Sequence, residues 1–206
     1  DGGILSTNNK KIGKKIRQNS NLGFKVLTAS SNQIVISKDK RQNPNYSRFT
    51  EIGFNYRMNE FSAAIALAQI ERIKFFIKLR RMAGKAFDKL LQGNKYLIPQ
   101  KINPKEYSSY YTFATKLIIK NKKKLNWIKF RKKFIEYGGD GIYAASKLIY
   151  QEPAIKKYSI GKFYSTPVAE KLQKNLLLFT TNQKNKKEIQ VQINALKSTI
   201  KFFGLN

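Results

Sequence analysis

The sequence predicts a mixed α/β protein that ends in an α+β region. One observation is the pattern of residues 59–92, where apolar side chains recur at three- and four-residue spacing, as on one face of an amphipathic helix. A second is the order of patterns after Pro104: strand, helix, strand, short helix, strand and helix. Such an order is typical of an α+β domain.

The first element expected is a short strand over residues 2–7, which follow a glycine turn. Asn8 or Asn9 can then cap a helix that runs to about Asn19, with Gly23 beyond it as a stop signal. Residues 24–52 are mixed: residues 33–36 predict a short strand, and residues 38–46 predict a polar loop.

The next element is a long helix that begins at Asn59. The Asn59 side chain can accept hydrogen bonds from backbone amides, and Glu60 lies in the first turn, where the helix dipole favours a carboxylate. Its predicted apolar face consists of Phe61, Ala64, Ile65, Ala68 and Ile73. We expect one helix to continue to about Gln92, to end at Gly93-Asn94, and to bridge two subdomains.

The remaining elements follow from alternation and from stop signals. We expect strands at 110–119, 141–145 and 176–179, and helices at 126–137, 166–172 and 186–203. The last helix has one apolar face, made by Ile189, Ile193, Leu196, Ile200 and Phe203.

The composition excludes several kinds of chemistry. The chain has no cysteine and no histidine, so it holds no disulfide, no thiolate nucleophile, no Ser-His-Asp triad and no histidine-bound zinc. Its 12 acidic residues are scattered, and we expect no metal site. No apolar run approaches the roughly 20 residues of a membrane span, and no leader is recognisable, so we expect a cytoplasmic protein without a membrane partner.

A formal net charge of +29 normally suggests nucleic acid or an anionic membrane surface. The cations here are mostly Lys, spread along the chain and accompanied by many Ile and Asn residues. These three residue types share A/T-rich codons, so genomic base composition explains them together. Arginine, which reads guanine edges, is comparatively scarce. We therefore expect no sequence-specific nucleic-acid partner.

One segment carries a more specific signal, and it reads Gly53-Phe54-Asn55-Tyr56-Arg57-Met58-Asn59-Glu60, followed by an alanine-rich helix to Ile70. It resembles the "G-Y-N-Y-R-M" block of sugar aminotransferases of the DegT/StrS type. The resemblance extends to residues 1–9 and 17–23, and more weakly to residues 141–143, 167–170 and 176–179. Phe179-Thr180 departs from the Leu-Pro usual in that family.

The resemblance implies a type-I pyridoxal-phosphate fold like that of aspartate aminotransferase. Residues 1–58 would form the end of the large cofactor domain and an interface loop, 59–93 a long bridging helix, and 94–206 the small C-terminal α+β domain. The implied activity is amino transfer from an amino acid, usually glutamate, to a nucleotide-linked keto-sugar, with pyridoxal phosphate as cofactor. The product would feed glycan or surface polysaccharide synthesis.

The resemblance also implies which residues act. The family's catalytic lysine lies just before the run that matches residues 1–3, so we expect it upstream of this chain and expect no catalytic residue within it. Family members are homodimers with shared active sites, in which the residue matching Asn55 reaches the partner's cofactor phosphate. Arg57 would lie near the same phosphate or the sugar diphosphate, and Tyr143 and Lys147 would line the sugar pocket.

Alternatives stay open for each of these residues. Asn55 and Arg57 could be solvated turn residues, or Arg57 could pair with Glu51 or Glu60. Tyr143 and Lys147 could be ordinary strand residues. For the whole chain, the alternatives are a non-catalytic homologue and a basic nucleic-acid-binding module.

Overall fold

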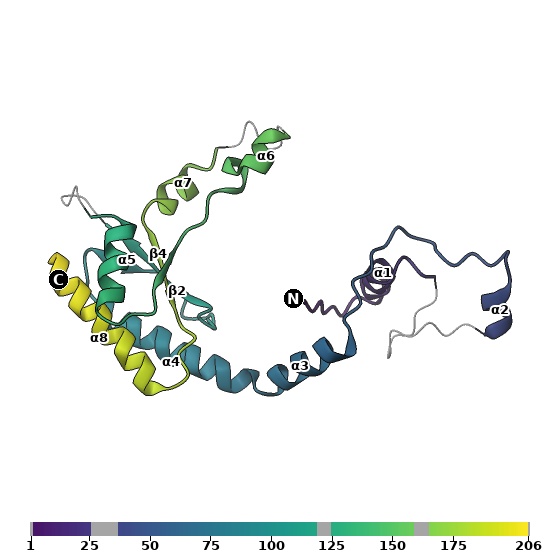
Figure 1. The fold of residues 1–206 in the computed structure, drawn as a ribbon, viewed down its shortest axis with the longest axis horizontal. Coiled ribbons are helices and arrows are strands. Elements are labelled where there is room, and N and C mark those ends of the chain that lie inside the picture. The colour runs from purple at the N-terminus through teal and green to yellow at the C-terminus, as the bar shows by residue number, and fades with distance from the viewer. Residues whose placement is uncertain (1, 26–36, 119–124, 159–164, 206) are drawn as a thin grey trace. The chain divides into compact units, whose positions relative to one another are not determined.

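The computed structural model describes residues 2–25, 37–118, 125–158 and 165–205. The chain divides into two compact units, Asp1–Glu71 and Arg72–Asn206, whose elements are labelled in Figure 1. The units are described separately below. Among the described residues, no helix combines the length and hydropathy needed to cross a membrane.

The described residues of the first unit form three helices: α1 (Lys10–Ser20), α2 (Lys38–Gln42) and α3 (Glu60–Glu71). The predicted first helix is confirmed, because the Asn9 side chain accepts from the backbone amides of Lys11 and Ile12. After α1 the chain pairs with the segment that precedes α3, through isolated antiparallel bridges at Asn21–Asn55 and Phe24–Phe49. This pairing fixes residue 55 next to the end of α1.

Two expectations for this unit were wrong, and one lies outside the described residues. Residues 2–7 form no strand, because they have no ladder of backbone hydrogen bonds with another segment in the described structure. Residues 38–42 form α2 rather than a loop, since the Ser37 hydroxyl caps the helix by accepting from the Lys40 amide. The predicted strand at 33–36 falls outside the described residues.

The predicted long helix is divided. It begins as expected, with the Asn59 side chain accepting from the Ser62 amide at 2.8 Å, but α3 ends at Glu71 and α4 (Ile73–Leu91) begins after Arg72. Arg72 has φ −98° and ψ 2°, outside the α-helical region. The apolar face of α3 is also uncovered, with Phe61 86% and Ile65 66% exposed.

The second unit is built on a four-stranded antiparallel sheet in the order β1-β2-β4-β3. Its strands are β1 (Leu97–Pro99), β2 (Thr112–Leu117), β3 (Ile142–Ala144) and β4 (Leu176–Thr180). The strands expected near 110–119, 141–145 and 176–179 are confirmed, whereas β1 was missed. In the register of the sheet, Phe179 of β4 lies between Phe113 of β2 and Ile142 of β3.

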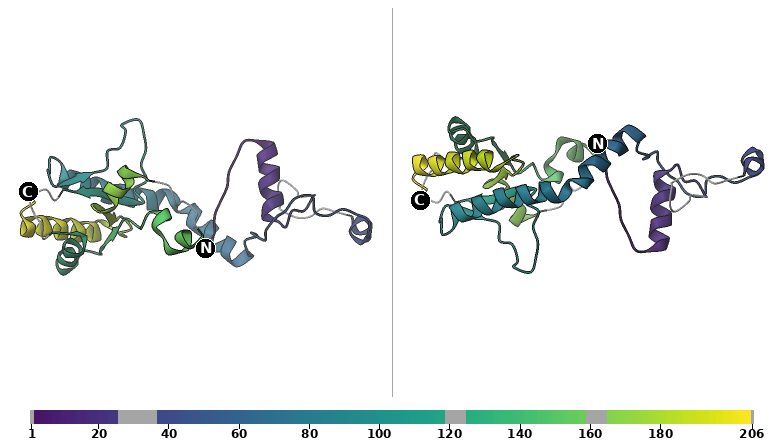
Figure 2. Two further views of the ribbon diagram at one scale, coloured as in Figure 1. Left: turned by 90° about the horizontal axis from the view of Figure 1, so that it is seen from above. Right: turned by 90° about the horizontal axis from the view of Figure 1, so that it is seen from below.

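Helices α4, α5 (Trp127–Glu136) and α8 (Lys186–Phe203) supply the rest of the core. Contacts link α8 to both α4 and α5, and both views in Figure 2 show α4 and α8 alongside each other. The Phe179 ring is fully buried, with ring centroids of Phe87, Phe134 and Phe130 at 5.3, 5.5 and 6.4 Å. The predicted helices at 126–137 and 186–203 are confirmed.

Short helical elements lie between β3 and β4: η1 (Ile149–Gln151), α6 (Pro153–Lys157) and α7 (Pro167–Gln173). Only α7 was predicted. The Tyr150 hydroxyl donates to the Glu170 carboxylate of α7 at 2.5 Å. This hydrogen bond, with one from the Thr166 amide, lowers the pKa of the half-buried Glu170 carboxyl.

Helix α4 packs so closely against Tyr110, which precedes β2, that residue 84 of the helix has to be glycine. Tyr110 has φ 51°, and its ring lies so close to Gly84 that an added Cβ would sit 2.5 Å from ring carbons. We expect Gly84→Ala to destabilise the second unit by about 1–3 kcal/mol, the usual cost of overpacking a core. Urea unfolding followed by the fluorescence of Trp127, the single tryptophan, measures this.

The control is Gly13→Ala in α1, where the nearest side-chain atom to the added methyl is Arg17 Nη1 at 3.5 Å. Alanine also has the higher helix propensity. An unchanged unfolding midpoint in Gly84→Ala would contradict the close packing of Tyr110 on α4.

Candidate functional site

The segment that carries Asn55 is held in place by two glycines. Gly23 has φ +79°, and a Cβ there would collide with the backbone carbonyl of Glu51. A Cβ on Gly53 would collide with the backbone amide of Gly23. The two backbones therefore lie too close for any other residue type. Asn55 follows directly and is fixed by the hydrogen bonds of this paired region.

The Asn55 side chain is oriented by Arg57. The Arg57 Nε–H donates to Asn55 Oδ1 at 2.9 Å. Because the amide oxygen is engaged, the Nδ2–H₂ group remains as the hydrogen-bond donor of this side chain. Arg57 forms no salt bridge with Glu51 or Glu60, both of which lie in the described part of the chain. The proposed structural pairing of Arg57 with either carboxylate is therefore absent.

Asn55 and Arg57 border a hollow of about 590 Å³ within the first unit. Its lining comprises Gly2, Gly3, Ile4, Leu5, Ser62 and the run Asn55, Tyr56, Arg57, Met58 and Asn59. The lining contains one cation and no carboxylate. The first turn of α3 also borders it, and amides at a helix N-terminus favour an anion through their unpaired N–H groups and the helix dipole.

This donor set fits the phosphate of pyridoxal phosphate. A phosphate is an anion whose oxygens accept hydrogen bonds. The hollow offers the Asn55 amide, the Arg57 guanidinium and the start of α3. No side chain in the lining would repel an anion. The residues that the sequence singled out for the cofactor, Asn55 and Arg57, are thus brought together.

A second pocket, of about 380 Å³, lies on the sheet of the second unit. On β2 and β4, Phe113 and Phe179 point into the core, so alternation places Thr112, Leu178 and Thr180 on the opposite face. These residues line the pocket together with Arg80, Tyr111, Tyr143, Ala144, Ser146, Thr181 and Asn182. The pocket therefore lies on the sheet face turned away from the core helices.

Two tyrosines and several small polar groups dominate this pocket. Tyr111 is 80% and Tyr143 63% exposed, so both rings are accessible to a ligand. Threonine, serine and asparagine side chains offer both donors and acceptors. Aromatic faces beside such groups suit a sugar ring, which presents C–H bonds on its faces and hydroxyls at its edge.

Arg80 organises one wall of the pocket, and the sequence analysis missed it. Its Nη1 donates to the Tyr111 carbonyl at 2.9 Å and to the Thr181 hydroxyl at 3.1 Å. The Thr181 hydroxyl in turn donates to the Tyr110 carbonyl at 2.5 Å. In the sequence, Arg80 is distinguished only by being an arginine among many lysines. This does not indicate which groups it contacts.

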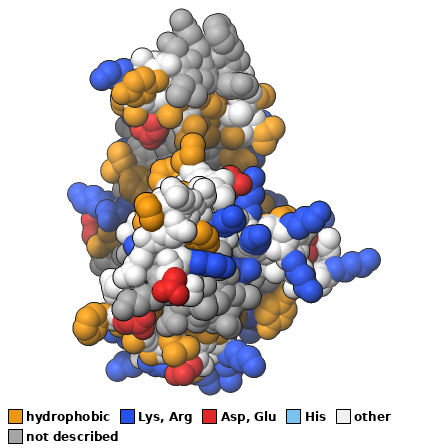
Figure 3. Space-filling model, turned by 90° about the vertical axis from the view of Figure 1, so that its right-hand side faces the viewer, with side chains coloured by type: hydrophobic (Ala, Val, Ile, Leu, Met, Phe, Trp, Pro, Cys, Tyr) orange, Lys and Arg blue, Asp and Glu red, His pale blue; other side chains and the backbone are white. Residues whose placement is uncertain are grey.

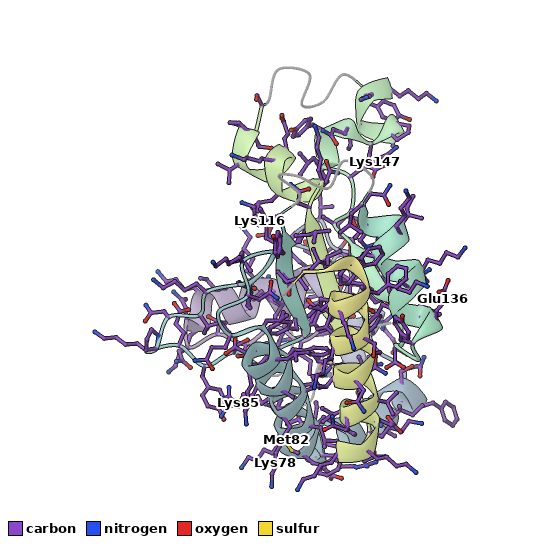
Figure 4. The ribbon with its side chains drawn as sticks, turned by 90° about the vertical axis from the view of Figure 1, so that its left-hand side faces the viewer. Lys78, Met82, Lys85, Lys116, Glu136 and Lys147 are labelled. Carbon is purple, nitrogen blue, oxygen red and sulfur yellow. The ribbon has the colours of Figure 1, made fainter. Side chains whose placement is uncertain are left out.

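Lys147 lies apart from the lining of this pocket. It is exposed in the segment that follows β3, where Figure 4 labels it, and it does not line the pocket that Tyr143 borders. Of the two residues expected around a sugar, the structure places Tyr143 at a pocket and Lys147 on the surface.

Comparison with known proteins identifies the family. A model of the DegT/DnrJ/EryC1/StrS aminotransferase family matches residues 1–196. The chain belongs to this family. The resemblance seen in the sequence is confirmed, and so is the mixed α/β fold of the type-I pyridoxal-phosphate enzymes.

Individual members of the family show the extent of the likeness. A UDP-4-amino-4,6-dideoxy-N-acetyl-beta-L-altrosamine transaminase of Helicobacter pylori is 31% identical over 62 residues, 30% of this chain and 16% of that protein. The structure of Helicobacter pylori PseC, an aminotransferase of pseudoaminic acid biosynthesis, matches 96% of this chain at TM-score 0.70 and 18% identity.

A second structure extends the comparison to another activity. The E. coli GDP-4-keto-6-deoxy-D-mannose-3-dehydratase with bound hydrated PLP matches 92% of this chain at TM-score 0.67 and 21% identity. These matches cover 48% of the PseC chain and 48% of the dehydratase chain. The chain therefore spans about half the length of the relatives whose fold it shares.

Proposed function

We propose that this chain is the C-terminal part of a pyridoxal-phosphate-dependent aminotransferase that acts on a nucleotide-linked keto-sugar. Residues 1–58 belong to its large domain and interface loop, 59–93 to the helical connection, and 94–206 to its small domain. The amino donor is an amino acid, and the product serves glycan or surface polysaccharide synthesis. The lysine that binds the cofactor covalently precedes residue 1.

The observation that carries this proposal is the orientation of Asn55. Its oxygen accepts from Arg57, so its amide N–H₂ is available for a phosphate oxygen at the hollow beside α3. When bound, pyridoxal phosphate supplies the electron sink that amino transfer requires. Asn55 and Arg57 hold its phosphate, and the start of α3 adds a favourable dipole.

The second pocket supplies the groups for the sugar. Tyr111 and Tyr143 offer ring faces, while the hydroxyls of Thr112, Thr180 and Ser146 offer hydrogen bonds at its edges. Arg80 holds the backbone of Tyr111 and the side chain of Thr181, which keeps this wall rigid. Such a pocket orients a keto-sugar by a few polar groups around an apolar surface.

We further propose that Asn55 serves the cofactor of a partner subunit, so that the active form is a homodimer with shared sites. The uncovered apolar face of α3, with Phe61 and Ile65 exposed, supports burial of this helix in a larger assembly.

The experiment uses the full-length protein loaded with pyridoxal phosphate. We expect glutamate-dependent conversion of a nucleotide-linked 4-keto sugar to an amino sugar, detected by mass spectrometry. Borohydride reduction and peptide mapping should place the cofactor on one lysine before residue 1, and replacing that lysine by arginine should abolish conversion.

Two results would contradict the proposal. Absence of a modified lysine upstream would leave a non-catalytic homologue, or a dehydratase like the E. coli structural relative, as the better assignment. Stoichiometric modification of one lysine within residues 1–206 would place the catalytic residue in this chain instead.

A further inference from the structure

Helix α4 presents two different faces. One face packs into the core of the second unit through Ala83, Gly84, Phe87 and Leu91. The face turned away carries Lys74, Lys78, Arg81 and Lys85, separated by four, three and four residues, so that they follow one side of the helix. Figure 4 labels Lys78, Met82 and Lys85 along this helix.

This basic face lines a groove of about 490 Å³, formed by Lys74, Ile77, Lys78, Arg81, Met82, Lys85 and Tyr107. We call it the α4 groove. Its lining contains four cations and no carboxylate. Lys74, Lys78 and Lys85 form no salt bridge with any described residue. The nearest acids in sequence are Glu71, which precedes Lys74 by three residues, Asp88, which follows Lys85 by three residues, and Glu106, which precedes Tyr107.

An exposed aromatic ring completes the α4 groove. The Tyr107 side chain is 78% exposed, and its ring centroid lies 3.3 Å from the guanidinium carbon of Arg81. Arg81 Nη1 also donates to the Ser108 carbonyl at 2.5 Å. Arg81 therefore holds Tyr107 beside the row of lysines, instead of leaving the ring free to rotate into solvent.

We propose that the α4 groove binds a single strand of nucleic acid without sequence preference. With a rise of about 1.5 Å per residue, Lys74 and Lys85 lie roughly 16 Å apart along α4. That length matches about five phosphates of a stacked strand, at about 3.4 Å each. A basic groove with an aromatic ring is the arrangement that binds single strands by phosphate attraction and base stacking.

The same residues explain why no base sequence is read. Base edges are read best by planar bidentate groups such as arginine, asparagine or glutamine, whereas a lysine ammonium binds a phosphate as a point charge. The one arginine of the groove is engaged by Ser108 and Tyr107, and the other cations are lysines. On the face of the molecule in Figure 3, Lys and Arg side chains are not gathered into one patch.

A membrane surface fits the α4 groove less well. Helices that bind in a membrane interface bury a broad apolar face in the lipid. The apolar residues between these lysines, Ile77 and Met82, are half-buried in the floor of the groove. A single diphosphate fits less well too, because it needs two neighbouring cations and not a row about 16 Å long.

The test measures binding of the full chain to fluorescein-labelled (dT)20 by anisotropy, between 50 and 200 mM salt. We expect Lys78→Gln/Lys85→Gln to weaken binding about tenfold. It should also reduce the slope of log K against log salt by about 1.4, because each phosphate contact on a single strand contributes about 0.7. The control Lys187→Gln/Lys197→Gln removes the same charge from exposed sites on α8.

A second pair of variants tests the ring. Tyr107→Leu should weaken binding about tenfold, and Tyr107→Phe should leave it unchanged, because stacking needs the ring but not the hydroxyl. Circular dichroism of each variant shows whether it is folded. All are exposed positions, and unfolding is not expected.

Three outcomes would overturn the proposal. The control pair could weaken binding as much as the groove pair, which would indicate diffuse attraction to the whole chain. Tyr107→Leu could bind like the unmodified chain. Vesicles containing anionic lipid could bind the chain more tightly than (dT)20 does, and the groove variants could weaken vesicle binding about tenfold. That result would make the groove a membrane contact. Amino transfer is not measured here, so the result is independent of the proposed enzyme activity.

Discussion

In the proposed full-length dimer, Asn55→Ala is expected to weaken retention of pyridoxal phosphate by about tenfold to a hundredfold. The loss of one hydrogen bond to a charged group costs about 1.5–3 kcal/mol, and every 1.4 kcal/mol is about a factor of ten in the dissociation constant. Titration of the apo-protein with the cofactor measures this change, while Trp127 fluorescence reports that the second unit remains folded.

Asn55→Asp provides the sharper comparison. The aspartate is nearly isosteric and keeps an oxygen that can accept from Arg57 Nε, as Asn55 Oδ1 does in the structure. It replaces the donor N–H₂ by a negative oxygen that repels phosphate. We expect this variant to bind the cofactor more weakly than Asn55→Ala. If Asn55→Asp retained the cofactor normally, Asn55 would be only a turn residue held by Arg57.

The proposed action across the dimer has its own test. One subunit lacks the catalytic lysine but retains Asn55, and the other retains the lysine but carries Asn55→Ala. A heterodimer of the two contains one intact site if Asn55 serves its partner, so activity should reappear on mixing and subunit exchange. Heterodimers that form without regaining activity would place Asn55 in the site of its own subunit.

Phe179→Ala is expected to have the largest effect on stability. Phe179 is fully buried at the centre of β4, and its ring contacts those of Phe87, Phe130 and Phe134. Removing a buried phenylalanine ring costs about 3–5 kcal/mol, because apolar contacts are lost and a cavity remains. This is a large share of the stability of an ordinary domain, about 5–15 kcal/mol.

Urea unfolding followed by Trp127 fluorescence measures the effect. The matched control is Phe202→Ala in α8, where the side chain is 56% exposed, and we expect the midpoint to move little. Equal shifts in the two variants would show that the aromatic cluster around Phe179 is not the centre of this core.

Some features of the structure depend on residues close together in the chain, and others depend on residues far apart in it. Caps and periodicity were readable in advance: Asn9 begins α1, Asn59 begins α3, and the apolar face of residues 186–203 matches α8 along its whole length. These features depend on neighbours within one or two turns, so the local sequence contains them. The strands β2, β3 and β4 were also predicted: β2 from a β-branched and aromatic run, β3 as an extended segment that starts at Gly141, and β4 from a short apolar run.

Features that depend on distant neighbours were not readable. The long helix is divided at Arg72, where the sequence has no glycine or proline that would predict a break. Strand β1 has only three residues and exists because it pairs with β2. Lys147 was expected beside Tyr143 at a sugar pocket, and proximity in sequence could not show that the lining of the pocket extends to Ser146 but not to Lys147.

From the sequence we could predict α1, α5, α7 and α8, the start of α3, three of the strands, the family, and Asn55 and Arg57 as candidates for a phosphate. The contacts of those candidates became visible in the folded chain. It showed that Arg57 takes up the Asn55 oxygen and leaves a donor, and that Arg80 fixes a wall of the second pocket. The physical reason is that a hydrogen-bond partner is chosen by three-dimensional distance, which residues far apart in the chain acquire only when it folds.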